Sequence, residues 1–184
     1  IQDYSLFRAI GVSLFHSVAS FNNAGFDIFG GGQSMVPYTD NIYLNIITCV
    51  LIFFGGIGFL VIQELWQKKC QWKKLSMHTK VVLSVSLALI IIGTLLIKLT
   101  EPVSWLCALF HSVSTRTAGF ASRPIGDFGA PALLVMIVLM FIGASSGSTG
   151  GGIKTSTFFV LIRGIFSAAT NQSEKAFHYS IPKD

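Results

Sequence analysis

Two glycines in this sequence lie in nearly identical surroundings. The run LFHSV occurs at residues 14–18 and again at residues 109–113, and each copy is followed by Ala-Gly-Phe, with Gly25 and Gly119 about 94 positions apart. Backbone carbonyls aimed at one axis can replace the water around a cation, and such a turn uses conformations that a Cβ atom obstructs. The repeat therefore predicts two re-entrant pore loops that coordinate a cation.

Short polar segments around these glycines can supply further oxygens or brace the loops. We expect two filter loops, made of Asn22, Asn23, Ala24 and Gly25 in the first copy and of Thr115, Thr117, Ala118 and Gly119 in the second. One Ala-Gly-Phe alone would favour a simple helix cap, but its duplication together with LFHSV favours paired filter loops. Irregular backbone at membrane depth must be packed in protein or line water, which also favours a pore.

Arg116 lies inside the second filter loop, where a free positive charge would oppose a cation. A buried arginine must be paired or directed away, so we expect Arg116 to support the filter from behind, holding backbone carbonyls or the carboxylate of Glu101 or Asp127. His16 and His111 occupy matching places in the two LFHSV runs. Neither has a second type of metal ligand at helical spacing, so we expect packing or hydrogen-bonding roles for both.

Small and hydroxyl residues fill the segment 143–157, GASSGSTGGGIKTST. A phosphate-binding loop fails by one residue, because Ile153 separates the last glycine from Lys154 and no strand precedes the segment. A third filter loop fails because only about 30 residues separate the segment from Gly119. We expect a break in the last helix that acts as a gate, and a simple glycine kink is the alternative left open. The expected gate-loop residues are Gly143, Ser145, Ser146, Gly147, Ser148, Thr149, Gly150, Gly151, Gly152 and Lys154.

Composition places these loops in a membrane protein. Hydrophobic residues form 52% of the 184 residues and charged residues 11%, whereas soluble domains carry about a quarter charged residues. Three stretches are expected to cross the bilayer: residues 41–63, residues 81–99, and an interrupted stretch over residues 131–166. The first also carries three glycines, expected to allow close helix packing: Gly55, Gly56 and Gly58. The three cysteines lack any zinc-like spacing, so free or packed thiols are expected.

Lysines are concentrated in the connector between the first two stretches, at Lys68, Lys69, Lys73, Lys74 and Lys80. The positive-inside rule places this connector in the cytoplasm, so the net charge of +5 indicates topology rather than nucleic-acid binding. The helix at 41–63 then runs inward and the helix at 81–99 runs outward. Residues 103–113 re-enter from outside as a half-helix, with Pro102 in its first turn.

The repeating unit is thus a helix, a half-helix, a glycine loop and a second helix. Residues 1–80 hold the half-helix, filter loop, inward helix and cytoplasmic connector of one unit. Residues 81–184 hold the complete next unit, with its outward helix, half-helix, filter loop and broken inward helix carrying the gate loop. Since one loop surrounds only part of an ion, a central pore needs about four such loops.

The segments FHSVASFNNAGFDIFG, FHSVSTRTAGF and GASSGSTGGGIKT resemble the Ktr/Trk/HKT superfamily of potassium transporters, most closely the Ktr membrane subunit. The resemblance implies an all-α polytopic protein of the bacterial plasma (inner) membrane, with potassium-channel-like helix–pore-helix–helix repeats and re-entrant filter loops. The chain resembles most of the second and all of the third of four pore units. Gly25 and Gly119 would then be filter glycines, and residues 143–157 the intramembrane gate loop with Lys154 as its basic residue.

The same resemblance implies potassium uptake, with K+ as the transported ion, no covalently bound cofactor, and sodium left open as a coupling ion. It also implies contact with membrane lipid, a homodimer of the membrane subunit and a cytosolic ring of nucleotide-binding regulatory subunits, without nucleic acid. Two alternatives remain. A membrane enzyme or nucleotide-driven pump would need paired intramembrane acids, for which Glu64 is the lone candidate. A structural membrane subunit or fragment would have no transport activity of its own.

Overall fold

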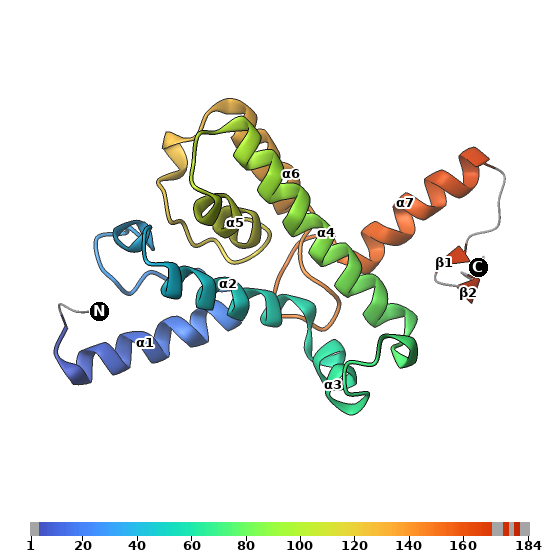
Figure 1. Ribbon diagram of the computed structural model, residues 1–184, viewed down its shortest axis with the longest axis horizontal. Helices are drawn as coiled ribbons and strands as arrows, with labels where there is room; N and C mark the ends of the chain where they lie inside the picture. Colours follow the sequence, from blue (N-terminus) through green and yellow to red (C-terminus); the bar gives the residue numbers. More distant parts are fainter. Residues whose placement is uncertain (1–3, 171–174, 177–178, 181–184) are drawn as a thin grey trace.

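The computed structural model describes residues 4–170, 175–176 and 179–180, and its architecture is helical (Figure 1). The helices are α1 (Leu6–Phe21), α2 (Ile42–Ile57), α3 (Phe59–Gln67), α4 (Met77–Thr100), α5 (Trp105–Ser114), α6 (Ala130–Phe141) and α7 (Thr155–Thr170). Near the C-terminus, β1 (Lys175–Ala176) pairs with β2 (Tyr179–Ser180) as a two-residue antiparallel ladder. The predicted all-α class is confirmed, with this short ladder as its one addition among the described residues.

Helix α4 is the longest element, and α5, α6 and α7 pack against it, while α1 packs on α2 (Figure 1). Its 24 residues give a length of about 36 Å, enough to cross a bilayer. The helix predicted at residues 81–99 lies within it. In the part of the chain that the structure describes, α4 alone is long and apolar enough to span a membrane, and the bent pair α2 and α3 would give a second span.

A sharp bend at Gly58 separates α2 from α3. The axes of the two helices differ by 94°, so the prediction of one straight helix over residues 41–63 is wrong. Gly58 has a φ of 86°, which a side chain disfavours, and the amide of Phe59 donates to the carbonyl of Gly147 at 3.1 Å. The bend is therefore stabilised by a contact with the segment between α6 and α7.

The two LFHSV runs both lie in short apolar helices, the first in α1 and the second in α5. Helix α5 begins after Ser104, whose hydroxyl accepts from the amide of Cys107 at 3.1 Å as an N-cap. Pro102 therefore precedes the helix, and its predicted place in the first turn is wrong. Most of α5 is buried, whereas α1 exposes large apolar side chains such as Phe7 and Leu14 along one side.

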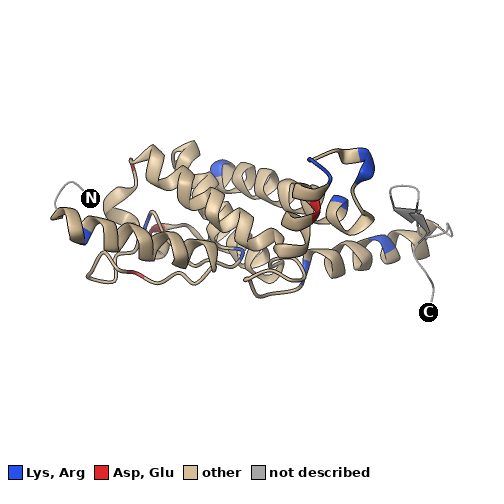
Figure 2. Cartoon of the chain, turned by 90° about the horizontal axis from the view of Figure 1, so that it is seen from below, with Lys and Arg blue, Asp and Glu red and all other residues tan. Residues whose placement is uncertain are grey.

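One apolar core joins the two predicted units. It contains Ala19, Met35, Cys49, Ile52, Phe110, Val113, Ala118 and Phe120, which come from both LFHSV segments, from α2 and from the loops after them. The three cysteines are free, with Cys49 and Cys107 buried and Cys70 exposed, as predicted. Charged residues are sparse along the helices and gather near the connector between α3 and α4 (Figure 2).

Candidate ion pathway at the two filter loops and the gate loop

The two filter loops contact each other through their backbones. Gly25 has a φ of 66° and Gly119 a φ of 78°, so both occupy the left-handed region that favours glycine. A Cβ atom placed on Gly25 would lie 2.2 Å from the carbonyl oxygen of Ala118. The first loop thus leaves room for a carbonyl of the second only because position 25 has no side chain.

Matching residues of the two repeats also bond directly to each other. The hydroxyl of Thr117 donates to the side-chain oxygen of Asn23 at 3.1 Å across a sequence separation of 94 residues. Asn23 is 8% exposed and has a φ of 53°, a conformation that asparagine tolerates better than most residues. The structure therefore places Asn23, Gly25, Thr117 and Ala118 together.

The other predicted filter residues are placed differently. Asn22 is exposed, and its amide donates to the carbonyl of Val18 at 2.9 Å, so it caps the end of α1. Thr115 likewise donates to the carbonyl of His111 at 2.6 Å, within its own helical turn. Ala24 is exposed and its amide bonds to the carbonyl of Ala19 at 2.9 Å. The side chains of Asn22 and Thr115 brace helix ends rather than join the two loops.

Arg116 links the second filter loop to the predicted gate loop. Its guanidinium donates to the carbonyl of Gly143 at 2.9 Å, which agrees with the backbone-carbonyl version of its expected contacts. The expected contact of Arg116 with a carboxylate is wrong. The carboxylate of Glu101 accepts from the amide of Gly129 instead. Asp127 takes part through its backbone carbonyl, which accepts from Arg123 at 3.1 Å.

Helix α6 ends at Phe141 and α7 begins at Thr155, so the predicted break in the last helix is present. The intervening loop folds back on itself: the amide of Gly143 donates to Ile153 at 3.1 Å, and that of Ala144 donates to Gly151 at 3.0 Å. A Cβ atom on Gly143 would lie 1.9 Å from the carbonyl oxygen of Gly151. The close pairing of its two sides explains the glycine at position 143.

The first half of this loop is bonded to the corner between α2 and α3. The amide of Ser145 donates to Gly56 at 3.0 Å and that of Thr149 to Gly55 at 3.3 Å, while the Ser145 hydroxyl donates to Ile57. Gly55 also approaches α1, since its Cβ atom would lie 1.8 Å from the carbonyl oxygen of Phe21. Gly55 therefore admits the end of a neighbouring helix, as predicted, whereas Gly56 and Gly58 face the loop between α6 and α7.

The second half of the loop is bonded mainly to itself. Lys154 donates to the carbonyl of Gly150 at 2.7 Å, and a Cβ atom on Gly150 would lie 2.8 Å from the Thr117 methyl group. Gly147 and Gly152 have φ values of 72° and 77°. Ser148 bonds to the carbonyl of Ser145 at 2.6 Å, while the hydroxyls of Ser146 and Ser156 lie 3.4 Å apart.

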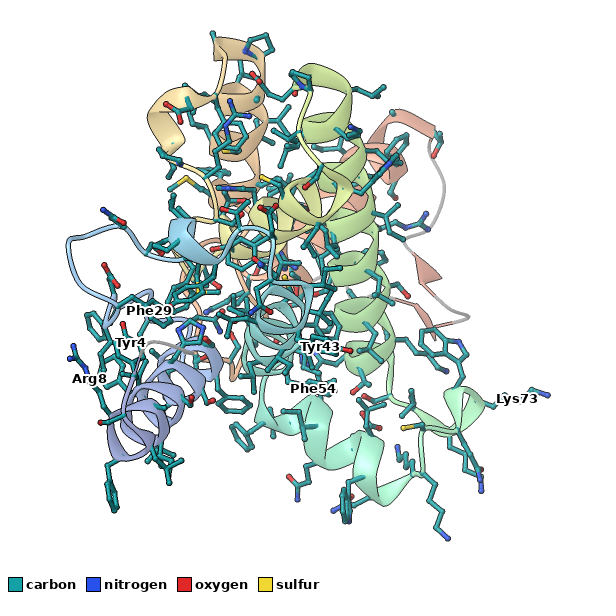
Figure 3. The ribbon with its side chains drawn as sticks, turned by 60° about the vertical axis from the view of Figure 1, so that its left-hand side comes forward. Tyr4, Arg8, Phe29, Tyr43, Phe54 and Lys73 are labelled. Atoms are coloured by element: carbon teal, nitrogen blue, oxygen red, sulfur yellow. The ribbon has the colours of Figure 1, made fainter. Side chains whose placement is uncertain are left out.

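Both histidines of the LFHSV runs are buried in aromatic surroundings. The Nε2 atom of His16 lies 2.9 Å from the Thr48 hydroxyl, and its ring packs against Phe29, which lies over α1 (Figure 3). The ring of His111 packs edge-on against Phe128, with centroids 4.8 Å apart. These contacts match the expected packing and hydrogen-bonding roles, and no cluster of three metal-ligating side chains occurs within the described residues.

The α2–α3 corner is the part of the site that sequence reasoning missed. Its signal is the group Gly55, Gly56 and Gly58, for which the sequence predicts close helix packing because hydroxyl residues do not accompany them. Gly55 does meet the end of helix α1, whereas Gly56 meets Ala144 and Gly58 meets Gly147, both in the loop between α6 and α7. Glycine clusters in an apolar helix can thus mark the approach of an irregular loop.

The site thus consists of two glycine loops that meet a broken helix in a helical fold. Residues 2–184 match the family model of TrkH, a cation transport protein. The chain therefore belongs to the TrkH family, and its resemblance to the Ktr/Trk superfamily is confirmed.

Relatives of known name agree with this assignment. The Ktr system potassium uptake protein B of Vibrio alginolyticus is 44% identical over 164 residues, which cover 80% of this chain and 35% of the relative. The potassium/sodium uptake protein NtpJ of Enterococcus hirae is 36% identical over 173 residues, covering 88% of this chain and 38% of the relative. The chain thus spans little more than a third of the length of these relatives.

The fold itself is shared with a solved structure. The crystal structure of the potassium transporter TrkH from Vibrio parahaemolyticus superposes with a TM-score of 0.71 at 23% identity, over 91% of this chain and 38% of that one. At this identity the superposition shows a common fold.

Proposed function

We propose that this chain supplies two adjacent pore units of a membrane transporter that takes up potassium. The observation that carries the proposal is the meeting of the two filter loops, in which Gly25 leaves room for the Ala118 carbonyl and Thr117 bonds to Asn23. The names of the relatives as potassium uptake proteins support the choice of ion. The units comprise residues 1–80 and 81–184, and two further units complete the ring of loops.

In this proposal, carbonyl oxygens of the filter loops replace part of the water around K+. Gly25 and Gly119 allow the turns that direct those carbonyls toward the pore axis. The segment 143–154 lies on the cytoplasmic side of the filter as a gate, and Lys154 adds a positive charge that opposes the passing ion. Arg116 keeps its positive charge but directs its guanidinium to the carbonyl of Gly143, and it supports the filter rather than facing the ion.

The surroundings of Glu64 support a structural role rather than acid catalysis. Its carboxylate accepts from Lys68 at 2.5 Å and from the hydroxyl and amide of Ser76 at 2.6 and 2.8 Å. The Thr79 hydroxyl also donates to it. Since Ser76 is the N-cap of α4, the negative charge stabilises the helix N-terminus and joins α3 to α4. Among the described residues the partners of Glu64 are Lys68, Ser76 and Thr79, and none of them is a second acid.

The remaining parts of the proposal concern partners and location. We place the transporter in the bacterial plasma membrane as a multi-pass protein. In this proposal the membrane subunit forms a homodimer, and the dimer binds a cytosolic ring of nucleotide-binding subunits. Sodium is the second ion to consider, because one relative is named as a potassium/sodium uptake protein. A structural subunit without transport is the competing function.

Potassium uptake by the complete four-unit transporter tests the proposal. In a bacterium that lacks its own potassium uptake systems, expression should restore growth at limiting K+ and give saturable K+ uptake that excess Na+ inhibits weakly. Cells with an empty vector give the background. Protein that is expressed and inserted but takes up no K+ would favour the structural-subunit alternative.

Membrane orientation gives a second prediction. Cys70 is exposed, whereas Cys49 and Cys107 are buried. Cys70 belongs to the same connector as Lys73, whose side chain points away from the helices (Figure 3). The lysine-rich connector should lie in the cytoplasm, so an impermeant thiol reagent should label Cys70 only after the cells are permeabilised. A Gln33→Cys change in a Cys70→Ser background should be labelled in intact cells, because that exposed loop lies outside. The reverse labelling pattern would overturn the orientation.

A further inference from the structure

The gate loop contacts the filter directly through one hydroxyl group. The side-chain amide of Asn23 donates to the Thr149 hydroxyl at 2.8 Å, and that hydroxyl donates to the carbonyl of Phe21 at 3.0 Å. Phe21 is the last residue of α1, where backbone carbonyls lack partners within the helix. A residue of the gate loop thus completes the hydrogen bonding at the end of the first half-helix.

These bonds form a chain with a defined direction. The Thr149 hydroxyl gives its single proton to Phe21, so toward Asn23 it can only accept. Asn23 must therefore present its NH2 group to Thr149 and its oxygen to Thr117, which donates to it at 3.1 Å. The amide orientation follows from the network, and Thr149 fixes it.

The same loop divides into two parts by its bonding partners. Ser145 and Thr149 bond to residues of α1 and α2, and Gly147 accepts from the first residue of α3. Gly151 and Ile153 instead bond back to Ala144 and Gly143 on the other side of the loop. The part up to Thr149 is therefore anchored to the filter surroundings, while the part that ends at Lys154 is held within the loop.

We propose that Thr149 is a positioning residue for the ion filter. By holding the amide of Asn23 against Thr117, it keeps the first filter loop in register with the second. The anchored part of the loop then sets the discrimination between K+ and Na+, and the part near Lys154 sets the rate of passage. This inference rests on the proposed function, because it assigns to one residue of the loop a role in the filter of that transporter.

The expected size of the effect follows from the burial of Asn23, while Thr149 itself is exposed. Asn23 is 8% exposed, and removing one partner of a buried hydrogen-bonded group leaves the other partner unsatisfied. Thr149→Val keeps the shape of the side chain and removes the hydroxyl that Asn23 and Phe21 share. The expected loss is about tenfold in the preference for K+ over Na+.

The test compares hydroxyl variants in the complete four-unit transporter, measuring K+ uptake and its competition by Na+. Thr149→Val should lower the K+ preference about tenfold, and Thr149→Ser, which keeps the hydroxyl, should retain it. Thr100→Val removes a hydroxyl that bonds only within α4, so it should leave both rate and preference unchanged. Each variant is compared at equal amounts of membrane-inserted protein.

Thr117→Val breaks the other end of the network and decides the question if Thr149→Val fails to insert. It should lower the K+ preference, and a double variant should lose little more than either single one because both act on Asn23. Normal discrimination in a transporting Thr149→Val or Thr117→Val protein would overturn the inference while leaving the proposed function intact. A wild-type transporter that takes up no K+ would remove both.

Discussion

Replacing Gly25 with serine should abolish most of the discrimination between K+ and Na+ in the complete four-unit transporter. The new Cβ atom would lie 2.2 Å from the Ala118 carbonyl oxygen, so one of the two filter loops must shift. The backbone φ of 66° adds strain of about 1–2 kcal/mol for a residue with a side chain. A displaced carbonyl no longer fits the ion, so we expect a loss of about tenfold or more in K+ preference.

Competition of Na+ with K+ uptake measures this effect, and Gly11→Ser provides the control. Gly11 lies in α1 with nothing within 4 Å of its Cβ position, so a serine there should leave the K+ preference unchanged. Gly119→Ser should lose preference through its φ of 78°, although its Cβ position has free space within the described residues. Unaltered discrimination in a well-inserted Gly25→Ser protein would contradict the assignment of the filter.

Replacing Lys154 with methionine should raise the maximal rate of K+ uptake by about tenfold, because the substitution removes both a charge and a bond. The Lys154 ammonium donates to the carbonyl of Gly150 at 2.7 Å and so ties the end of the loop to its middle. A unit positive charge near the ion path costs a passing cation on the order of a few kcal/mol at the dielectric of a protein interior. The apparent affinity for K+ should change little, because the filter determines it.

Two lysine variants distinguish this explanation from a general effect of charge. Lys154→Arg keeps the positive charge and should stay close to the wild-type rate. Lys73→Met removes an exposed charge in the connector before α4 and should leave the rate unchanged. If the break in the last helix were only a packing kink, Lys154→Met would transport at the wild-type rate, and the gate assignment would have to be abandoned.

The sequence predicts most of the elements near the proposed pathway because their signals are local. The duplicated LFHSV and Ala-Gly-Phe runs locate both half-helices and both glycine turns, and Gly25 and Gly119 do adopt positive φ values. The cluster of glycines and hydroxyl residues locates the break between Phe141 and Thr155. The long apolar run at residues 81–99 locates α4. Each of these predictions depends on composition or repetition within a short window.

The features that sequence reasoning missed depend on partners distant along the chain. Residues 41–63 form one unbroken apolar stretch, and the bend at Gly58 arises from the bond between Phe59 and Gly147. Arg116 binds a backbone carbonyl, which is one of its two expected kinds of partner, but the sequence does not indicate that this carbonyl belongs to Gly143. Backbone carbonyls carry no mark in a sequence, so neither contact could be predicted before the two segments were seen together.

The bond between Asn23 and Thr117 limits how the two pore units of this chain can differ in sequence. In a duplicated structure, equivalent positions meet only close to the axis of pseudosymmetry, and here one copy supplies the acceptor and the other the donor. If positions 23 and 117 were both asparagine or both threonine, the two side chains would need equivalent partners. The structure supplies only one Thr149 hydroxyl, which bonds to residue 23. A substitution at position 23 or 117 therefore changes the hydrogen bonding of the equivalent residue in the other unit.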